Sequence, residues 1–230
     1  MYGARIETIL SLMPACRTAA DIGTDHGITA IGMLARGKAR RVIATDISPA
    51  SLSKAQAYAA AHRVSDLETR LGDGLEPLTP GEADAAVLAG MGGRLIARIL
   101  GANPEIARSI PIFILQPMHS IRDLRRWLYE NQYAVTAEWL AREADRFYHV
   151  MRATHGQDEL ILPLHMEIGR KLIEDRDPLL PDYIAHLSKK IRRRMREIAA
   201  HDTPRSRAAL LQCQALERMY REALDETDSR

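Results

Sequence analysis

Residues 19–27 have the sequence AADIGTDHG, which is the most informative segment of the chain about its fold. Its apolar start is typical of a buried strand, and it leads directly into Asp21, Ile22 and Gly23. Glycine at that point allows the backbone to turn sharply and to approach a ligand closely. Because nucleotides bind at the carboxyl ends of strands in open α/β sheets, the stretch predicts a strand, a turn and a ligand site in direct succession.

The centre of this stretch differs from the dinucleotide-binding fingerprint. A GxGxxG turn holds a pyrophosphate on backbone N–H groups. Here Asp25 stands where the middle glycine would be, and its carboxylate would repel phosphate. A cationic ligand is expected instead, and the sulfonium and ammonium of S-adenosylmethionine meet that requirement. The alternative is a plain strand-to-helix turn with solvated acids, because isolated glycine motifs often arise by chance.

Two more acids stand at the ends of later predicted strands. Asp46 ends the run VIATD, 23 residues after Gly23, a spacing at which a carboxylate can accept both ribose hydroxyl hydrogens. Asp73 lies between Gly72 and Gly74, where a carboxylate can accept a hydrogen bond from the adenine amino group. Helix capping by Asp46 and ordinary turn chemistry at 72–74 are the alternatives. Acids at three successive strand ends favour an adenosine ligand.

A glycine-rich loop, Gly90-Met91-Gly92-Gly93, follows the fourth predicted strand. In methyltransferases built on an open α/β sheet, the methyl donor meets its acceptor just after the fourth strand. The Asp/Asn-Pro-Pro-aromatic tetrapeptide common in enzymes that methylate exocyclic amines is absent. The glycines leave room for a planar base with Met91 against one face, whereas a hinge and helix start is an equal interpretation of Gly93.

From Thr18 to His155 the sequence alternates short β-rich runs with helical stretches, as in an α/β sheet with right-handed crossovers. Strands are expected at 18–22, 41–45, 67–71, 83–89 and 111–116, and helices at 28–35, 49–62, 95–100 and 121–131. The β-rich runs 133–141 and 147–154 predict an antiparallel hairpin. We therefore expect residues 1–155 to form an α/β, Rossmann-like domain resembling class I methyltransferases. It should open with a helix that carries Ile6, Ile9, Leu10 and Met13.

Residues 156–230 are predicted to form a separate helical hairpin. The β signal disappears after Gly156, and the segment 175–182 interrupts the chain before a long helical stretch. Two apolar seams at coiled-coil-like spacing follow, on either side of Thr203 and Pro204, which suit an N-cap and first helical position. The seams are Ile184, Leu187, Ile191, Met195 and Ile198, then Ala209, Cys213, Leu216, Tyr220 and Ala223.

The hairpin carries a strong local charge on a nearly neutral chain. The whole sequence has 32 Lys and Arg against 30 Asp and Glu, so no global cationic field coats it. Residues 186–207 hold eight basic side chains and two acids, a local charge of +6. A solvated coiled-coil flank is one interpretation. The other is a site for RNA phosphates, formed by Lys189, Lys190, Arg192, Arg193 and Arg196.

The composition indicates the cellular compartment and argues against a membrane-bound protein. Only Cys16 and Cys213 are present, too far apart in sequence to suggest a disulfide framework or a zinc site, and we expect a reducing cytoplasm and no metal. No apolar run approaches the roughly 20 residues that span a bilayer, so no membrane association is expected. A monomer is favoured, although the sequence leaves the oligomeric state open.

Four motifs together resemble a known family. DIGTDHG, AGMGG, ILQPM and READRFYHVM, followed by a helical hairpin, are similar to the bacterial enzymes that methylate N1 of adenine 22 in tRNA. The resemblance covers the whole chain and is strongest over residues 6–151. Family members read DIGSDHA, GNG and QPN, so Thr24, Gly27, Asp73 and Met118 are departures from the pattern.

The resemblance implies a cofactor, a partner and a set of site residues. It implies S-adenosyl-L-methionine as cofactor, tRNA as partner, and Asp25 as the catalytic residue that orients the base and offsets its developing charge. The cofactor would contact Asp21, Gly23, Thr24, His26, Gly27, Asp46, Asp73, Gly74, Gly90 and Met91. The acceptor base would contact Gly92, Gln116, Pro117 and Tyr148.

Other interpretations stay open. His26 suits a pocket donor and a purely structural helix start equally well, and Tyr148 suits base stacking or core packing. A nicotinamide dehydrogenase is disfavoured because the pyrophosphate glycines are missing. A non-catalytic adaptor that binds S-adenosylmethionine, with the hairpin as its partner surface, is the main alternative, and a methyltransferase with a different acceptor is another.

Overall fold

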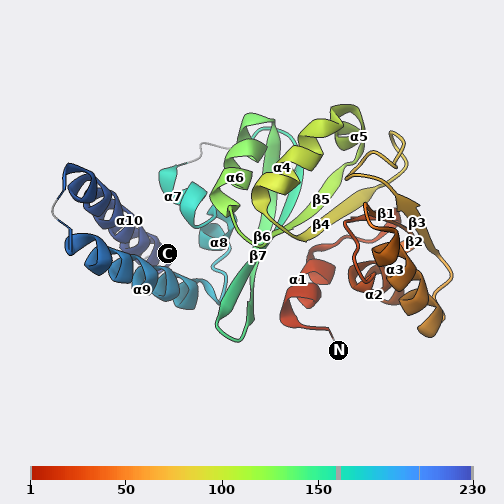
Figure 1. Ribbon diagram of the computed structural model, residues 1–230, viewed down its shortest axis with the longest axis horizontal. Helices are drawn as coiled ribbons and strands as arrows, with labels where there is room; N and C mark the ends of the chain where they lie inside the picture. The colour runs from red at the N-terminus through yellow and green to blue at the C-terminus, as the bar shows by residue number, and fades with distance from the viewer. Residues whose placement is uncertain (1, 159–161, 202, 229–230) are drawn as a thin grey trace. The chain divides into compact units, whose positions relative to one another are not determined.

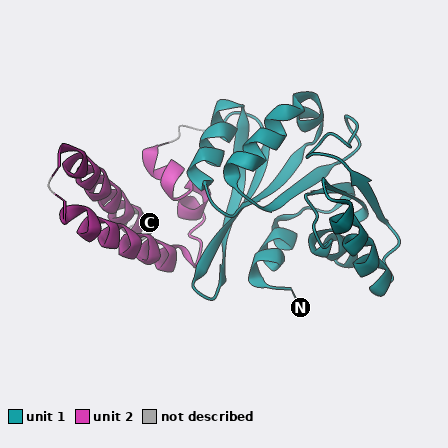
Figure 2. Cartoon of the chain, viewed as in Figure 1, with its two compact units in different colours: residues 1–160 teal, residues 161–230 magenta. Residues whose placement is uncertain are grey.

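The structure is a computed structural model that describes residues 2–158, 162–201 and 203–228. The chain divides into two compact units, residues 1–160 and residues 161–230 (Figure 2). Across these described ranges, no helix is long and apolar enough to cross a membrane.

The first unit is built on a seven-stranded sheet in the order β3-β2-β1-β4-β5-β7-β6 (Figure 1). The first five strands pair in parallel, and β6 and β7 form an antiparallel hairpin that joins the sheet at β5. This confirms the predicted Rossmann-like class I methyltransferase fold. The strands are β1 Cys16–Ile22, β2 Ala39–Asp46, β3 Leu67–Leu71, β4 Ala85–Met91, β5 Ile112–Pro117, β6 Tyr133–Glu143 and β7 Arg146–His155.

Helices cover both faces of the sheet, because alternate side chains of the buried strands point to opposite sides. One core packs beneath α4, α5 and α6 and includes Ala20 and Leu88. The other packs beneath α1 and α2 and includes Ala19 and Val87. The helices of this unit are α1 Ala4–Leu12, α2 Ile28–Ala35, α3 Pro49–Ala61, α4 Gly93–Ala102, α5 Pro104–Ser109 and α6 Ile121–Glu130.

The predicted boundaries needed small corrections. Helix α4 begins at Gly93 rather than 95, and β4 begins at Ala85 rather than 83. Helix α5 was not predicted, because its six residues are too few to show a helical period. Its first residue is Pro104, a common start for a short helix because proline lacks an N–H there.

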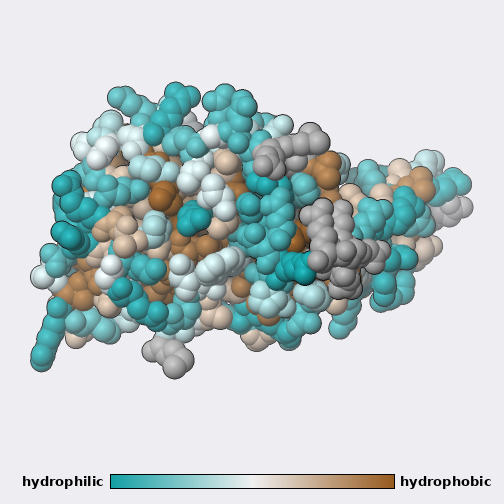
Figure 3. Space-filling view, turned by 180° about the vertical axis from the view of Figure 1, so that it is seen from behind, coloured by the Kyte–Doolittle hydropathy of each residue, from teal (hydrophilic) through white to brown (hydrophobic). Residues whose placement is uncertain are grey.

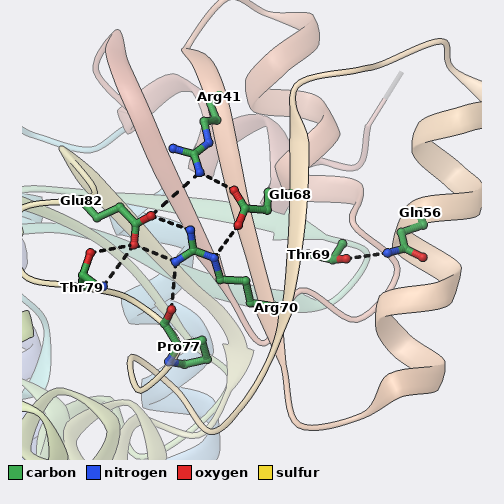
Figure 4. A network of polar contacts seen from close by, with 8 residues as sticks. All are labelled: Arg41, Gln56, Glu68, Thr69, Arg70, Pro77, Thr79 and Glu82. Atoms are coloured by element: carbon green, nitrogen blue, oxygen red, sulfur yellow. Dashed lines mark hydrogen bonds and ion pairs between the residues drawn. The ribbon is translucent and has the colours of Figure 1, made fainter.

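A charged network lies at the sheet edge formed by β3 (Figure 4). Arg70 donates to both carboxylate oxygens of Glu82, at 2.7 and 2.5 Å, and to Glu68 at 2.7 Å. Arg41 of β2 is also paired with Glu68. Charged side chains on an edge strand oppose pairing with another chain. The bonds from Arg70, opposed in part by burial, lower the pKa of Glu82 to about 2.

Glu82→Gln should lower the free energy of unfolding by about 1–2 kcal/mol at pH 7, because a bidentate charged pair is lost at a partly buried site. The depressed pKa means that the native Glu82 carboxylate stabilises above about pH 4.5. This contribution declines as pH falls toward 2. Denaturant unfolding at pH 7 and pH 3 measures it, with exposed Glu130→Gln as the control. A gap between wild type and variant that does not shrink at pH 3 would contradict the assignment.

The second unit consists of helices, and its two long ones pack along each other. Five of the ten predicted seam residues are buried: Ile184 and Ile191 of α9 and Cys213, Tyr220 and Ala223 of α10. The other five, Leu187, Met195, Ile198, Ala209 and Leu216, are half-buried. Thr203 accepts a hydrogen bond from the Ser206 backbone N–H at 3.0 Å, which confirms the predicted cap. The helices are α7 Pro163–Glu167, α8 Arg170–Glu174, α9 Leu180–Ala199 and α10 Pro204–Asp228. The single-turn helices α7 and α8 were not predicted.

Candidate functional site

The turn after β1 is held by backbone and side-chain hydrogen bonds. The N–H groups of Gly23 and Thr24 both donate to the Thr45 carbonyl of β2, at 2.8 and 3.0 Å. Gly23 has φ +72°, a conformation that glycine adopts without strain. The Thr24 hydroxyl donates to the buried Asp21 carboxylate at 2.6 Å. The predicted sharp turn is therefore present, and it places Asp21 beneath the loop that carries Asp25.

Burial raises the pKa of Asp21 to about 6, although the hydrogen bond from Thr24 lowers it; the nearby Asp46 carboxylate adds to the rise. An acid with a raised pKa is destabilised in its charged form until a cation comes close. A positively charged ligand in the adjoining cavity would supply that cation. This chemistry fits the sulfonium and ammonium groups predicted from the sequence.

Asp25 stands in an unusual backbone conformation at the rim of this turn. Its φ is +48°, in the left-handed region that aspartate enters more readily than most residues other than glycine. Its N–H donates to the Asp46 carboxylate at 3.2 Å. Its side chain is 67% exposed, and one oxygen lies 3.6 Å from Nε2 of His26. The carboxylate is therefore open to a substrate, while its backbone is fixed to the next strand end.

Asp46 ends β2 and uses both carboxylate oxygens on backbone donors. One accepts the Ser48 N–H at 2.8 Å and the other accepts the Asp25 N–H. Ser48, rather than Asp46, is the N-cap of α3. Each carboxylate oxygen has a second lone pair, so Asp46 can still accept hydrogen bonds from a ribose.

Two apolar side chains that the sequence analysis missed lie exposed near Asp46. Ile47 follows Asp46 and is 71% exposed, and Leu71 at the end of β3 is 59% exposed. Exposed aliphatic side chains at the carboxyl ends of neighbouring strands suit the flat face of an adenine. An isoleucine directly after an acidic strand end was the signal that could have found this surface.

A cavity of about 300 Å³ lies against the turn. The residues that line it come from four places in the chain: the turn and start of α2, the end of β4 at Ala89 and Gly90, Met118 after β5, and the N-terminal helix α1. Among the sequence-predicted residues, the lining contains Asp21, Gly23, Thr24, Asp25, His26 and Gly90. Arg5 and Ile6 of α1 also line it, and neither was predicted.

The glycine-rich segment 90–93 was predicted to follow the fourth strand, but Gly90 and Met91 form the end of β4, where the pairing with β5 shifts register, and Gly93 begins α4. Gly90 has φ +78°, and a Cβ there would have open space, with Arg5 Nη1 nearest at 3.9 Å. A Cβ on Gly93 would come within 2.4 Å of the Ser120 carbonyl oxygen, so Gly93 is required for close packing at the start of α4. The Met91 methyl group lies against Gly23. Gly90 and Met91 therefore adjoin the turn, whereas Gly93 is a structural helix start.

Gln116 and Pro117 are buried, in contrast to the expectation that they contact a base. The Gln116 side-chain oxygen accepts hydrogen bonds from Arg5 Nη1 at 2.9 Å and from the Gly90 N–H at 3.1 Å. Its amide nitrogen donates to the Pro117 carbonyl at 3.0 Å. Gln116 thus holds Gly90 in place, and in this structure its polar atoms are occupied by protein groups.

Asp73 and Gly74 lie outside the 300 Å³ cavity. They line a second hollow of about 230 Å³ together with Arg98 and Ile99 of α4. The Asp73 carboxylate is 3.8 Å from Arg98 Nη1. Gly74 has φ +58°, and a Cβ there would collide with Ile99 at 2.7 Å. The structure therefore places Asp73 beside a cation that sequence reasoning did not anticipate.

Within the second unit, one side of the helical hairpin forms a groove of about 460 Å³. Lys189, Arg192 and Arg196 of α9 line it together with Arg221 and the buried Tyr220 of α10. Arg192 also donates to Glu217 at 2.5 Å. The part of this unit visible in Figure 3 has a mainly hydrophilic surface with scattered hydrophobic residues.

The other two predicted phosphate contacts differ in position. Lys190 and Arg193 are exposed and lie outside the groove lining. Arg193 donates to Glu197 of the same helix at 2.9 Å. The hairpin therefore presents its basic residues on more than one side, and three of the predicted five share the groove.

Known proteins resemble this chain in sequence and in structure. Residues 2–151 match the family described as methyltransferase domain. The Bacillus subtilis tRNA (adenine(22)-N(1))-methyltransferase is 33% identical over 180 residues, which is 75% of each protein. The crystal structure of the B. subtilis M1A22 tRNA methyltransferase TrmK superimposes with a TM-score of 0.86 at 28% identity, covering 98% of this chain and 99% of that one. A Streptococcus pneumoniae protein solved with S-adenosyl-L-methionine has a TM-score of 0.84 at 26% identity, covering 97% and 100%.

Proposed function

The chain belongs to the family of bacterial tRNA (adenine(22)-N(1))-methyltransferases, and we propose that it transfers the methyl group of S-adenosyl-L-methionine to N1 of adenine 22 in tRNA. The observation that carries this proposal is the exposed Asp25 carboxylate at the rim of a cavity formed by the glycine turn. An exposed carboxylate beside a ligand cavity at the carboxyl ends of β1 and β4 suits catalysis better than it suits a passive adaptor.

The chemistry asks the protein mainly for positioning. S-adenosylmethionine, when bound, supplies an electrophilic methyl group on sulfur. N1 of adenine has a free lone pair, so no proton has to be removed before it attacks, and correct orientation can supply much of the rate. The ring becomes positively charged as the N1–carbon bond forms and the sulfur–carbon bond breaks, with the electron pair of that bond left on the now neutral sulfur. The Asp25 carboxylate can accept a hydrogen bond from the exocyclic amino group and offset that charge.

The residues at the strand ends are suited to different parts of the cofactor. We assign the methionine end to the turn at Asp21, Gly23 and Thr24, which lines the cavity. Asp46 is assigned to the ribose hydroxyls and Ile47 to the adenine face. We keep Asp73 and Gly74 as candidates for the adenine edge, and His26 and Gly27 as contributors to the turn. Tyr148 remains a candidate for contact with the acceptor base.

The test of the proposed function uses tRNA transcripts and mass spectrometry. Purified protein and S-adenosylmethionine should convert adenine 22 to N1-methyladenine in a wild-type transcript, and should leave a transcript with guanine 22 unmodified. S-adenosylhomocysteine binding is measured in parallel by calorimetry. A protein that binds the cofactor product but methylates neither transcript would support the adaptor alternative. Methylation elsewhere in the tRNA would reject position 22.

We also propose that the protein acts in the cytoplasm as a monomer. Two cysteines that are not disulfide-bonded, one of them buried, suit a reducing compartment. Sedimentation of the protein with and without tRNA gives the stoichiometry directly, and a stable dimer would reject the monomer.

We further propose that the hairpin groove binds tRNA phosphates through Lys189, Arg192 and Arg196, with Lys190 and Arg193 as weaker outer contacts. Each Lys or Arg that neutralises a phosphate releases counterions and adds salt-dependent affinity. Lys189, Arg192 and Arg196 share the groove with Tyr220, although Arg192 is paired with Glu217. Lys190 and Arg193 lie outside the groove, and Arg193 is paired with Glu197. This difference allows two variants of equal charge to be compared.

Replacing both Lys189 and Arg196 with Gln should weaken tRNA binding and flatten the slope of log K against log salt by roughly 0.7–0.9 per lost contact. The matched control, Lys190→Gln with Arg193→Gln, removes the same charge from outside the groove and should change the slope less. Salt titrations of tRNA affinity compare the two, with melting temperatures confirming that both variants are folded. Equal effects from the two pairs would mean that only overall charge matters.

A further inference from the structure

Arg5 of α1 lies in the wall of the 300 Å³ cavity, although the sequence pattern predicted no role for this residue. Its backbone N–H donates to Glu143 at 2.9 Å, which anchors the start of α1 to the end of β6. One of its terminal N–H groups donates to Gln116 at 2.9 Å. Its guanidinium also lies 5.9 Å from the centre of the Tyr148 ring. The side chain is therefore held in place before any ligand arrives.

The wall of this cavity carries more carboxylate than Lys or Arg side chains. Among the described residues that line this cavity, two are carboxylates, Asp21 and Asp25, and the single Lys or Arg is Arg5. A guanidinium carries five N–H donors. The hydrogen bond to Gln116 takes one of the five Arg5 donors. The remaining donors leave Arg5 able to bind an anionic group within the cavity.

A methionine moiety presents one carboxylate, and that group needs a charged or strongly polar partner when it leaves water. Arginine matches a carboxylate in shape and charge, because two of its N–H groups can bind the two oxygens in parallel. The Gly23–Thr24 turn, which takes the methionine end in the proposed function, lines the same cavity as Arg5. A cation for that carboxylate would have to come from this wall.

We propose that Arg5 binds the carboxylate of the S-adenosylmethionine methionine moiety. This inference rests on the proposed function, since it takes the cavity to be the cofactor site. Gln116 then acts as a positioning residue that joins two sides of the cavity, because its oxygen accepts from both Arg5 and the Gly90 N–H. Binding of the carboxylate to Arg5 would thereby be coupled, through Gln116, to the position of Gly90 beside the space for the acceptor base.

The test compares two ligands that differ by the carboxylate alone. Calorimetry measures the binding of S-adenosylmethionine and of decarboxylated S-adenosylmethionine to the full chain without tRNA. Wild type should prefer the carboxylated ligand by about 10- to 100-fold, as expected for a charged hydrogen-bonded pair. Arg5→Gln should remove most of this preference by weakening S-adenosylmethionine binding, with the decarboxylated ligand little affected. Arg5→Lys should retain part of it.

Arg36→Gln is the matched control. Arg36 donates to both oxygens of Glu7 on α1, at 2.8 and 2.7 Å, so the variant also loosens α1 without touching the cavity lining. It should keep the wild-type preference. An absent preference in wild type would overturn the proposal even if Arg5→Gln does not fold.

Three results with a folded Arg5→Gln variant would also overturn the proposal. Equal loss of both ligands would indicate a structural role, and loss of neither would show that the carboxylate is bound elsewhere. Weaker tRNA binding with unchanged cofactor binding would assign Arg5 to an RNA phosphate. Because these measurements need no methyl transfer, they are distinguishable from failure of the tRNA methylation assay.

Discussion

Replacing Asp25 with Asn should slow methyl transfer by roughly 10²- to 10³-fold at saturating cofactor and tRNA, the range expected when a preorganised charge is removed from the reacting centre. Asn keeps nearly the same shape and can still accept a hydrogen bond from the adenine amino group. It cannot offset the positive charge that develops on the ring. The effect should therefore fall on the rate of the chemical step and only weakly on tRNA affinity.

Single-turnover kinetics isolate that step. His26→Gln is the informative companion, since His26 lies 3.6 Å from the Asp25 carboxylate and shares its loop. We expect this variant to stay within a few-fold of wild type. A slow His26 variant and a wild-type rate for Asp25→Asn would transfer the catalytic assignment from Asp25 to His26.

Asp46→Ala should weaken S-adenosylhomocysteine binding by about 1.5–3 kcal/mol, roughly 10- to 100-fold, because hydrogen bonds from the ribose to a carboxylate are lost. The structure adds a second consequence. Asp46 also accepts the backbone N–H groups of Asp25 and Ser48, so its removal should loosen the loop that carries Asp25. Methyl transfer should fall together with cofactor affinity.

Two further variants separate these effects in the calorimeter. Asp46→Asn retains an oxygen for the Ser48 N–H and removes the charge, and it should still bind the cofactor product more weakly than wild type. Asp84→Asn is the control, because Asp84 accepts two backbone N–H groups, those of Arg17 and Thr18, at the opposite end of β1. Unchanged affinity in a folded Asp46→Ala variant would reject the ribose assignment.

Local sequence pattern was sufficient to predict the fold class and the sharp glycine turn that follows β1. Runs of apolar residues have the period of their own secondary structure, so β1, α2 and β3 could be placed from local pattern alone. The turn at Asp21 and Gly23 was equally local, because the need for glycine arises within a few residues of chain. Long amphipathic seams likewise predicted α9 and α10.

Tertiary structure alone decided the partners of residues that meet across long stretches of chain. The sequence predicts that Gln116, at the end of a strand, contacts the acceptor base, yet its side chain is buried and hydrogen-bonded to Arg5 and Gly90. Asp25 has a left-handed backbone conformation, and its N–H donates a hydrogen bond to the Asp46 carboxylate, 21 positions away. Arg5 enters the cavity because α1 packs beside β6 and β7. Such contacts depend on how distant segments pack, and a period read along one segment carries no information about them.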